Sequence, residues 1–149
     1  MKVTIARQQE GEEECATLLV HRETEDMKSL RTYLEEERFR GIFLECRKDK
    51  EACRIHSRDI LYIEAVDEVQ LLHTALGVFE TRMRLYELEK CLPDTFVRIS
   101  RSVILALDKA AFYKPQLNGL MQVQLVNGDR VYISRQYLKK VRSRVLGEG

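Results

Sequence analysis

The stretch Phe96-Val97-Arg98-Ile99-Ser100-Arg101-Ser102-Val103-Ile104-Leu105-Ala106-Leu107-Asp108 decides how this chain folds. In its first part, apolar and polar residues alternate, which is the period of a strand with one buried face. The alternation stops at Arg101-Ser102, and the unbroken apolar run that follows is typical of a strand buried on both faces. The stretch therefore predicts two strands joined by a polar turn.

The predicted turn carries Ser100, Arg101 and Ser102 at an exposed corner. A guanidinium fork and two hydroxyls on a stiff frame suit phosphate oxygens or the edge of a guanine. An ordinary hairpin with a solvated tip has the same composition. Taken alone, this stretch leaves both interpretations open.

Strand patterns continue on either side of this stretch, and turn residues separate them. They cover residues 53–56, 60–66, 69–74, 78–82, 110–113, 121–125 and 131–133. Asn127-Gly128 is the strongest hairpin signal. Helical spacing predicts helices over 85–92, where Pro93 stops the helix, and over 135–145, where Ser134 is a candidate N-cap. The predicted fold class is mainly β (α+β), with about ten short strands and three short helices.

The first 47 residues predict a small α/β extension ahead of a main domain over 48–149. Apolar alternation or runs predict strands over 2–7, 16–21 and 42–46. Between the second and third strand, Thr24 is the expected N-cap of an amphipathic helix over 25–37. Two roles for this extension stay open, a structural cap that completes the fold or a site for a partner or for self-association.

Three further motifs complete the pattern: Ile60-Leu-Tyr-Ile-Glu-Ala65, Thr81-Arg-Met-Arg-Leu-Tyr-Glu-Leu-Glu89, and Asn127-Gly-Asp-Arg-Val-Tyr-Ile-Ser-Arg-Gln-Tyr-Leu138. In this order and spacing they resemble the LytTR family, the DNA-binding domain of many bacterial response regulators, over about Cys53 to Leu146. The resemblance implies a ten-stranded β fold that inserts loops, rather than a recognition helix, into successive major grooves. The first fifty residues are too short for the receiver domain that such regulators usually carry, so conventional phosphorelay control is not expected.

The resemblance also implies which side chains contact DNA. The positions expected to contact bases or phosphates are Ser100, Arg101, Ser102, Arg135, Gln136, Arg84 and the Asp67–Gln70 loop, in which Gln70 is the named contact residue. Lys139 is expected to add a contact to the DNA backbone. Gln136 stands where the family often has arginine or asparagine, and a glutamine can still pair with an adenine edge. The Asp67–Gln70 loop is acidic, so it is compatible with DNA only if it faces bases rather than phosphates.

The charge of the chain is unevenly distributed. Residues 95–149 hold ten Lys and Arg against three Asp and Glu, whereas the first fifty hold ten against twelve. A basic C-terminal part is suited to a polyanion. The four cysteines and three histidines show no metal-ligand spacing, and no catalytic constellation is present in the sequence. We therefore expect no metal, no cofactor and no enzymatic activity.

The sequence contains neither a signal peptide nor an apolar stretch long enough to cross a bilayer, which predicts a cytoplasmic protein. The predicted function is that of a bacterial transcriptional regulator, which binds short direct repeats in double-stranded DNA with two protomers on one face of the duplex. By analogy with other LytTR systems, a membrane-protein inhibitor is a candidate partner. The alternative is a non-enzymatic module that binds protein or RNA with the same fold.

Overall fold

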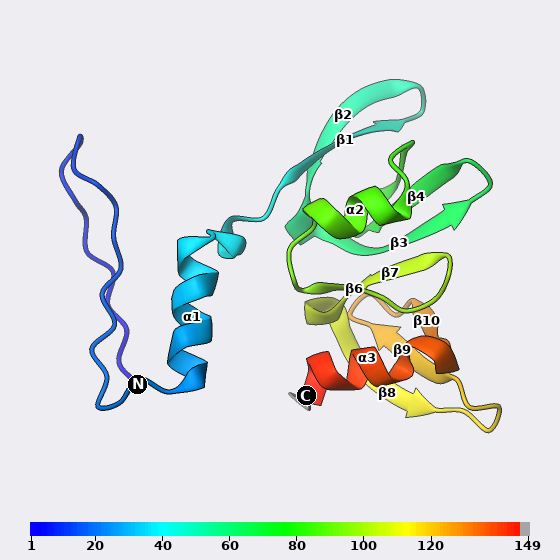
Figure 1. The fold of residues 1–149 in the computed structure, drawn as a ribbon. Helices are drawn as coiled ribbons and strands as arrows, with labels where there is room; N and C mark the ends of the chain where they lie inside the picture. Colours follow the sequence, from blue (N-terminus) through cyan, green and yellow to red (C-terminus); the bar gives the residue numbers. More distant parts are fainter. Residues whose placement is uncertain (147–149) are drawn as a thin grey trace. The chain divides into compact units, whose positions relative to one another are not determined.

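The computed structural model describes residues 1–146, apart from the side chains of Arg38 and Leu146. The chain divides into two compact units, Met1–Phe39 and a second unit that begins at Arg40 (Figure 1). Ten strands and three α-helices lie in the described residues. The predicted mainly β fold class is therefore confirmed.

The first unit consists of irregular chain followed by helix α1 (Glu25–Glu35). Thr24 caps this helix as predicted, because its hydroxyl accepts a hydrogen bond from the Met27 amide at 3.2 Å. The helix ends two residues before the predicted end, since Glu37 adopts a left-handed backbone with φ of 53°.

The strands predicted over 2–7 and 16–21 are not formed, which corrects that part of the sequence analysis. Their side chains are exposed, and Leu19 is 93% exposed. Apolar alternation stabilises a strand only where a neighbouring strand completes the ladder and a core covers one face. Neither condition is met for these residues in the first unit.

The second unit contains a seven-stranded antiparallel sheet of order β2-β1-β5-β4-β3-β7-β6. Its strands are β1 (Phe43–Lys48), β2 (Glu51–His56), β3 (Ile60–Val66), β4 (Val69–Thr74), β5 (Gly77–Thr81), β6 (Phe96–Arg98) and β7 (Val103–Ala106). The predicted strand 42–46 corresponds to β1, which pairs along its length with β2 and joins β5 at Arg47 and Glu80. β1 is therefore a strand of this sheet, and the two units divide at Phe39–Arg40.

Two further layers cover this sheet (Figure 1). One is helix α2 (Leu85–Cys91). The other is a three-stranded sheet of β8 (Ala110–Pro115), β9 (Met121–Leu125) and β10 (Arg130–Ile133), together with helix α3 (Arg135–Leu146). As the sequence predicts, Gly128 turns the β9–β10 hairpin with a positive φ of 93°.

Strand β7 joins the two cores. Ile104 and Ala106 belong to the core beneath α2, whereas Leu105 belongs to the core shared with the three-stranded sheet and α3. All three side chains are at most 1% exposed. Burial on both faces explains the unbroken apolar run of the deciding stretch, since alternate side chains of one strand point to opposite faces.

Antiparallel pairing gathers several chain connections at one end of the large sheet. The β3–β4 turn lies there, because Val66 pairs with Val69. The exit of β5 lies beside it, because Thr81 pairs with Gln70. The β6–β7 loop joins them, since Glu64 of β3 pairs with Val103 at the start of β7. This end of the sheet carries most of the residues singled out from the sequence.

Candidate nucleic-acid interface

The β6–β7 loop is a tight, ordered turn with a polar tip. The Ile99 amide donates to the Val103 carbonyl at 3.0 Å, which closes the loop. Within it, the Ser100 hydroxyl accepts a hydrogen bond from the Ser102 amide at 3.3 Å. Arg101 and Ser102 are exposed and Ser100 is half-buried. The loop therefore presents the Arg101 guanidinium on a fixed backbone, as the deciding stretch predicts.

Arg98 holds this loop from the last position of β6. Its Nε donates to the Ser100 carbonyl at 2.8 Å, and one Nη donates to the Arg101 carbonyl. The other Nη pairs with the Glu89 carboxylate of α2 at 3.3 Å. The side chain of Arg98 is only 18% exposed. The sequence shows a basic residue at Arg98, just before the turn. No local pattern indicates that this side chain donates to two carbonyls of the loop that follows it.

Backbone hydrogen bonds join the loop to two other predicted contact segments. The Ser134 amide, just before α3, donates to the Ile99 carbonyl at 2.9 Å. On the other side, the Ala65 amide near the end of β3 donates to the Ser102 carbonyl at 2.7 Å. These bonds between main-chain atoms do not depend on side-chain rotamers. They fix Arg101 between the start of α3 and the β3–β4 turn.

The first turn of α3 carries Arg135 and Gln136, both exposed. Lys139 is exposed as well and lies four residues after Arg135, so the two share a helix face. The predicted N-cap bond of Ser134 is not formed: its hydroxyl is buried and has no hydrogen-bond partner within residues 1–146. Instead, the Ser134 carbonyl accepts from the Tyr137 amide at 3.0 Å. The helix therefore starts at the predicted residue through its backbone alone.

Gln70 was predicted to read bases, and its position in the structure contradicts this prediction. It is 2% exposed, because β4 turns Gln70, Leu72 and Thr74 toward the interior. With its amide nitrogen oriented toward the neighbouring strand, it donates to the Thr81 carbonyl at 3.2 Å and to the Met83 carbonyl. A buried amide is satisfied in this way within the fold. Gln70 therefore supports the chain that leads out of β5.

Arg84 lies on that chain, at the N-cap position of α2. Its amide donates to the Glu87 carboxylate at 3.3 Å, and its side chain is exposed. Asp67 and Glu68 form the exposed β3–β4 turn nearby, where Asp67 has φ of 56°. Within the described residues, no ion pair neutralises the guanidinium of Arg84, Arg101 or Arg135, or the ammonium of Lys139. These cations are therefore available to an external anion.

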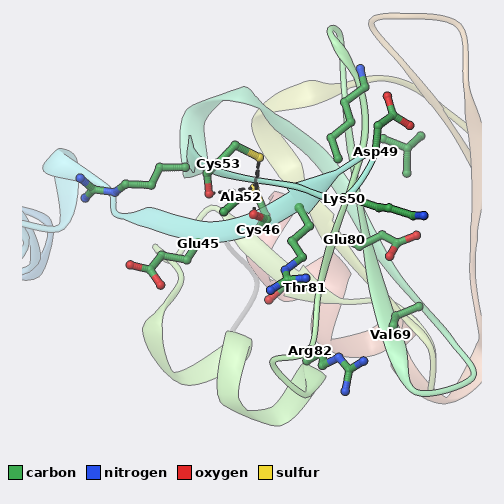
Figure 2. Close-up of a pocket in the computed structure, with 14 residues that line it drawn as sticks. Glu45, Cys46, Asp49, Lys50, Ala52, Cys53, Val69, Glu80, Thr81 and Arg82 are labelled. Atoms are coloured by element: carbon green, nitrogen blue, oxygen red, sulfur yellow. Dashed lines mark hydrogen bonds between the residues drawn. The ribbon is translucent and has the colours of Figure 1, made fainter.

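A groove of about 1170 Å³ lies between the β1–β2 hairpin and the strands β4 and β5 (Figure 2). Its rim carries charges of both signs, among them Glu45, Glu80 and Arg82. At one side, the Cys46 and Cys53 sulfurs lie 3.2 Å apart. Burial, followed by the contact with Cys53, raises the pKa of Cys46 to about 12, so this thiol is protonated at neutral pH. The groove therefore combines a protonated Cys46 thiol with a rim of mixed charge, which does not suit a polyanion.

Metal-ligating side chains do not gather in the described part of the chain, where no three His, Cys, Asp or Glu residues come together. His73 bonds to Glu64 at 2.7 Å and stacks on Tyr62, so this pair is held within the sheet surface. No helix within residues 1–146 is long and apolar enough to cross a bilayer.

Comparison with known proteins connects this geometry to a family. The family model of the LytTr DNA-binding domain matches residues 50–145. A Staphylococcus aureus protein named as an uncharacterized HTH-type transcriptional regulator is 37% identical over 99 residues, which make up 65% of this chain and 66% of that protein. A second S. aureus protein of the same description is 36% identical over an equal span. The match thus covers slightly less than two thirds of these relatives.

A solved structure shares the fold. It is the LytTr DNA-binding domain of a putative methyl-accepting/DNA response regulator from Bacillus cereus, and it superposes with a TM-score of 0.66. The superposition covers 70% of this chain and 96% of that domain, at 23% sequence identity.

Proposed function

The chain belongs to the LytTR family of DNA-binding domains, and on that premise we propose that it regulates transcription by binding double-stranded DNA at short direct repeats. The observation that carries the proposal is the pair of hydrogen bonds, Ser134 to Ile99 and Ala65 to Ser102, that joins three segments into one surface. Arg101 and Arg135 are exposed on this surface without ion-pair partners in the described chain.

The proposed contacts come from loops and from the first turns of α3, without a helix-turn-helix. Within residues 1–146, strands separate each α-helix from the next, so the described chain offers no helix-turn-helix. In the proposal, Arg101 reaches a guanine edge with two hydrogen bonds, and Ser100 and Ser102 hold the loop against the phosphates. Gln136 is suited to an adenine edge. Arg84 and Lys139 bind phosphates, and two protomers bind two repeats of one site.

Salt dependence tests the proposal. If Arg84 and Lys139 each neutralise one phosphate per protomer, a plot of log K against log salt should fall with a slope of roughly −2 per protomer, at about 0.9 per phosphate. A filter-binding titration over a range of salt concentrations measures this slope, and selection from a random DNA pool supplies the site. A slope near zero contradicts DNA binding and favours a module that docks a protein through apolar contacts.

Truncation tests the division of the chain. A fragment of residues 40–149 keeps all ten strands and should fold and bind DNA like the full chain. A fragment of residues 48–149 keeps only Lys48 of β1, which exposes the edges of β2 and β5 and removes Leu44 and Cys46 from the core. Its melting temperature should fall by more than about 4 °C, in line with a loss above 1 kcal/mol.

Thermal melts and DNA titrations of the two fragments check this expectation. If residues 40–149 are monomeric and bind DNA weakly where the full chain is dimeric and binds tightly, residues 1–39 serve association. That result would favour self-association over a purely structural role for residues 1–39.

A further inference from the structure

The turn between β8 and β9 lies against the proposed DNA-reading surface. Three hydrogen bonds close this turn: Gln116 amide to Leu120 carbonyl at 2.9 Å, Gly119 amide to Gln116 carbonyl at 3.1 Å, and Leu120 amide to the Asn118 side-chain oxygen at 3.1 Å. Its backbone is thus defined without help from any other segment. The sequence indicates a turn here, but does not indicate which side chain it contacts.

That side chain is Arg135. A methyl group built on Gly119 would lie 2.6 Å from the Cδ and 3.1 Å from the Cγ of Arg135. Its third-nearest neighbour, at 3.5 Å, would be the Nε of the same arginine. The aliphatic part of the Arg135 side chain therefore packs directly against the Cα of Gly119. Real Cβ atoms do not approach neighbours this closely, so only glycine permits this packing.

We propose that Gly119 is a positioning residue, which seats the Arg135 stem and thereby aims its guanidinium at one base of the DNA site. The proposal rests on the DNA-binding function proposed above. Arg135 is exposed and forms no ion pair within the described residues, so the contact with Gly119 is the restraint found on its stem. A bidentate contact needs one orientation of the guanidinium. Holding the stem beforehand lowers the entropy lost on binding.

The chain supplies a matched control for the test. Gly119 and Gly128 both lie in hairpin turns of the three-stranded sheet, with φ of 85° and 93°. Replacing either glycine with alanine strains a left-handed backbone to a similar extent. A Cβ on Gly128, however, meets no atom within 4 Å. Any difference between Gly119→Ala and Gly128→Ala in DNA binding therefore reports the contact with Arg135.

We expect Gly119→Ala to weaken binding of the selected site by more than about threefold, up to the loss caused by Arg135→Ala, and to relax preference at the same base position. Gly128→Ala should keep both the affinity and the preference. In the Arg135→Ala background, adding Gly119→Ala should change neither, because the side chain that it displaces is gone. The readouts are Kd values and base-preference profiles of the full-length proteins.

Three results overturn the positioning role while leaving DNA binding in place. The first is that Gly119→Ala has the same Kd and base preference as Gly128→Ala. The second is that Gly119→Ala weakens DNA binding equally in the parent and in the Arg135→Ala background. The third is that Arg135→Ala leaves DNA binding unchanged. Failure of the proposed function is distinct, since the unmodified protein would then bind DNA with a flat salt dependence. Should Gly119→Ala melt below the assay temperature, Gly119→Asn with Gly128→Asn replaces it, because asparagine tolerates the left-handed backbone and still carries a Cβ.

Discussion

Arg101→Ala is expected to weaken binding of the preferred DNA site by about 1–3 kcal/mol and to relax the preference at one base position. The guanidinium is exposed at the tip of a loop that is closed by the Ile99 and Val103 backbone bond. Its loss removes two hydrogen bonds to a base edge and leaves that edge unpaired. Titration with the selected site and with single-base variants measures both effects.

Lys139→Ala is the matched control for Arg101→Ala. Lys139 is an exposed cation on α3 and is proposed to meet only phosphate. Its removal should weaken all sequences about equally and reduce the salt slope by about one. Neither variant should shift the melting temperature, since neither side chain is buried. If Arg101→Ala binds every sequence as the parent does, the Arg101 side chain is only a solvent-exposed residue of the loop. The proposed base contact of Arg101 is then refuted.

Arg98→Ala should lower both stability and specific DNA binding. Its guanidinium binds the carbonyls of Ser100 and Arg101, and hydrogen bonds to a charged group contribute about 1.5–3 kcal/mol. Without these bonds, the loop loses the support that orients Arg101. Specific affinity should therefore fall roughly tenfold, as if one base contact were lost. Chemical denaturation and DNA titration of the same protein measure the two quantities.

Two further variants identify which bond of Arg98 matters. Glu89→Gln breaks the ion pair with Arg98, but the Glu89 side chain is 37% exposed, so the free energy of unfolding should change by less than about 1 kcal/mol. Arg98→Lys keeps the charge but lacks the planar fork that reaches both carbonyls. If Arg98→Lys binds DNA as tightly as the parent, Arg98 acts as a phosphate contact through its charge, and the proposed support of the β6–β7 loop by its guanidinium is refuted.

Local patterns predicted most of the second unit. The unbroken run from 103 to 107 indicated a strand buried on both faces, and β7 joins both cores. Asn127-Gly128 and Pro93 placed a hairpin and a helix end where the structure has them. Four motifs in the right order also indicated the family, since each motif belongs to one short segment. These predictions succeed because turn chemistry and hydrophobic period depend on residues that are adjacent in sequence.

Local patterns failed where the outcome depends on a distant segment. The strands predicted over 2–7 and 16–21 have a suitable period but no partner ladder. Gln70 has the residue type of a polar loop position, yet the pleat of β4 turns it inward, where its amide donates to the carbonyls of Thr81, at the end of β5, and of Met83. Ser134 has the residue type of an N-cap, but its hydroxyl is buried without a partner in the described chain.

Within the second unit, the sequence by itself determined which segments become strands, helices and turns, and which cations lie at their ends. Only the tertiary structure decided that Ser134, Ile99, Ala65 and Ser102 meet through their backbones, and that Arg135 rests on Gly119. The physical reason is that period and turn chemistry specify which face of a segment is buried, not what is packed against it. Pairing register and the close approach of a glycine arise only when distant segments share one core.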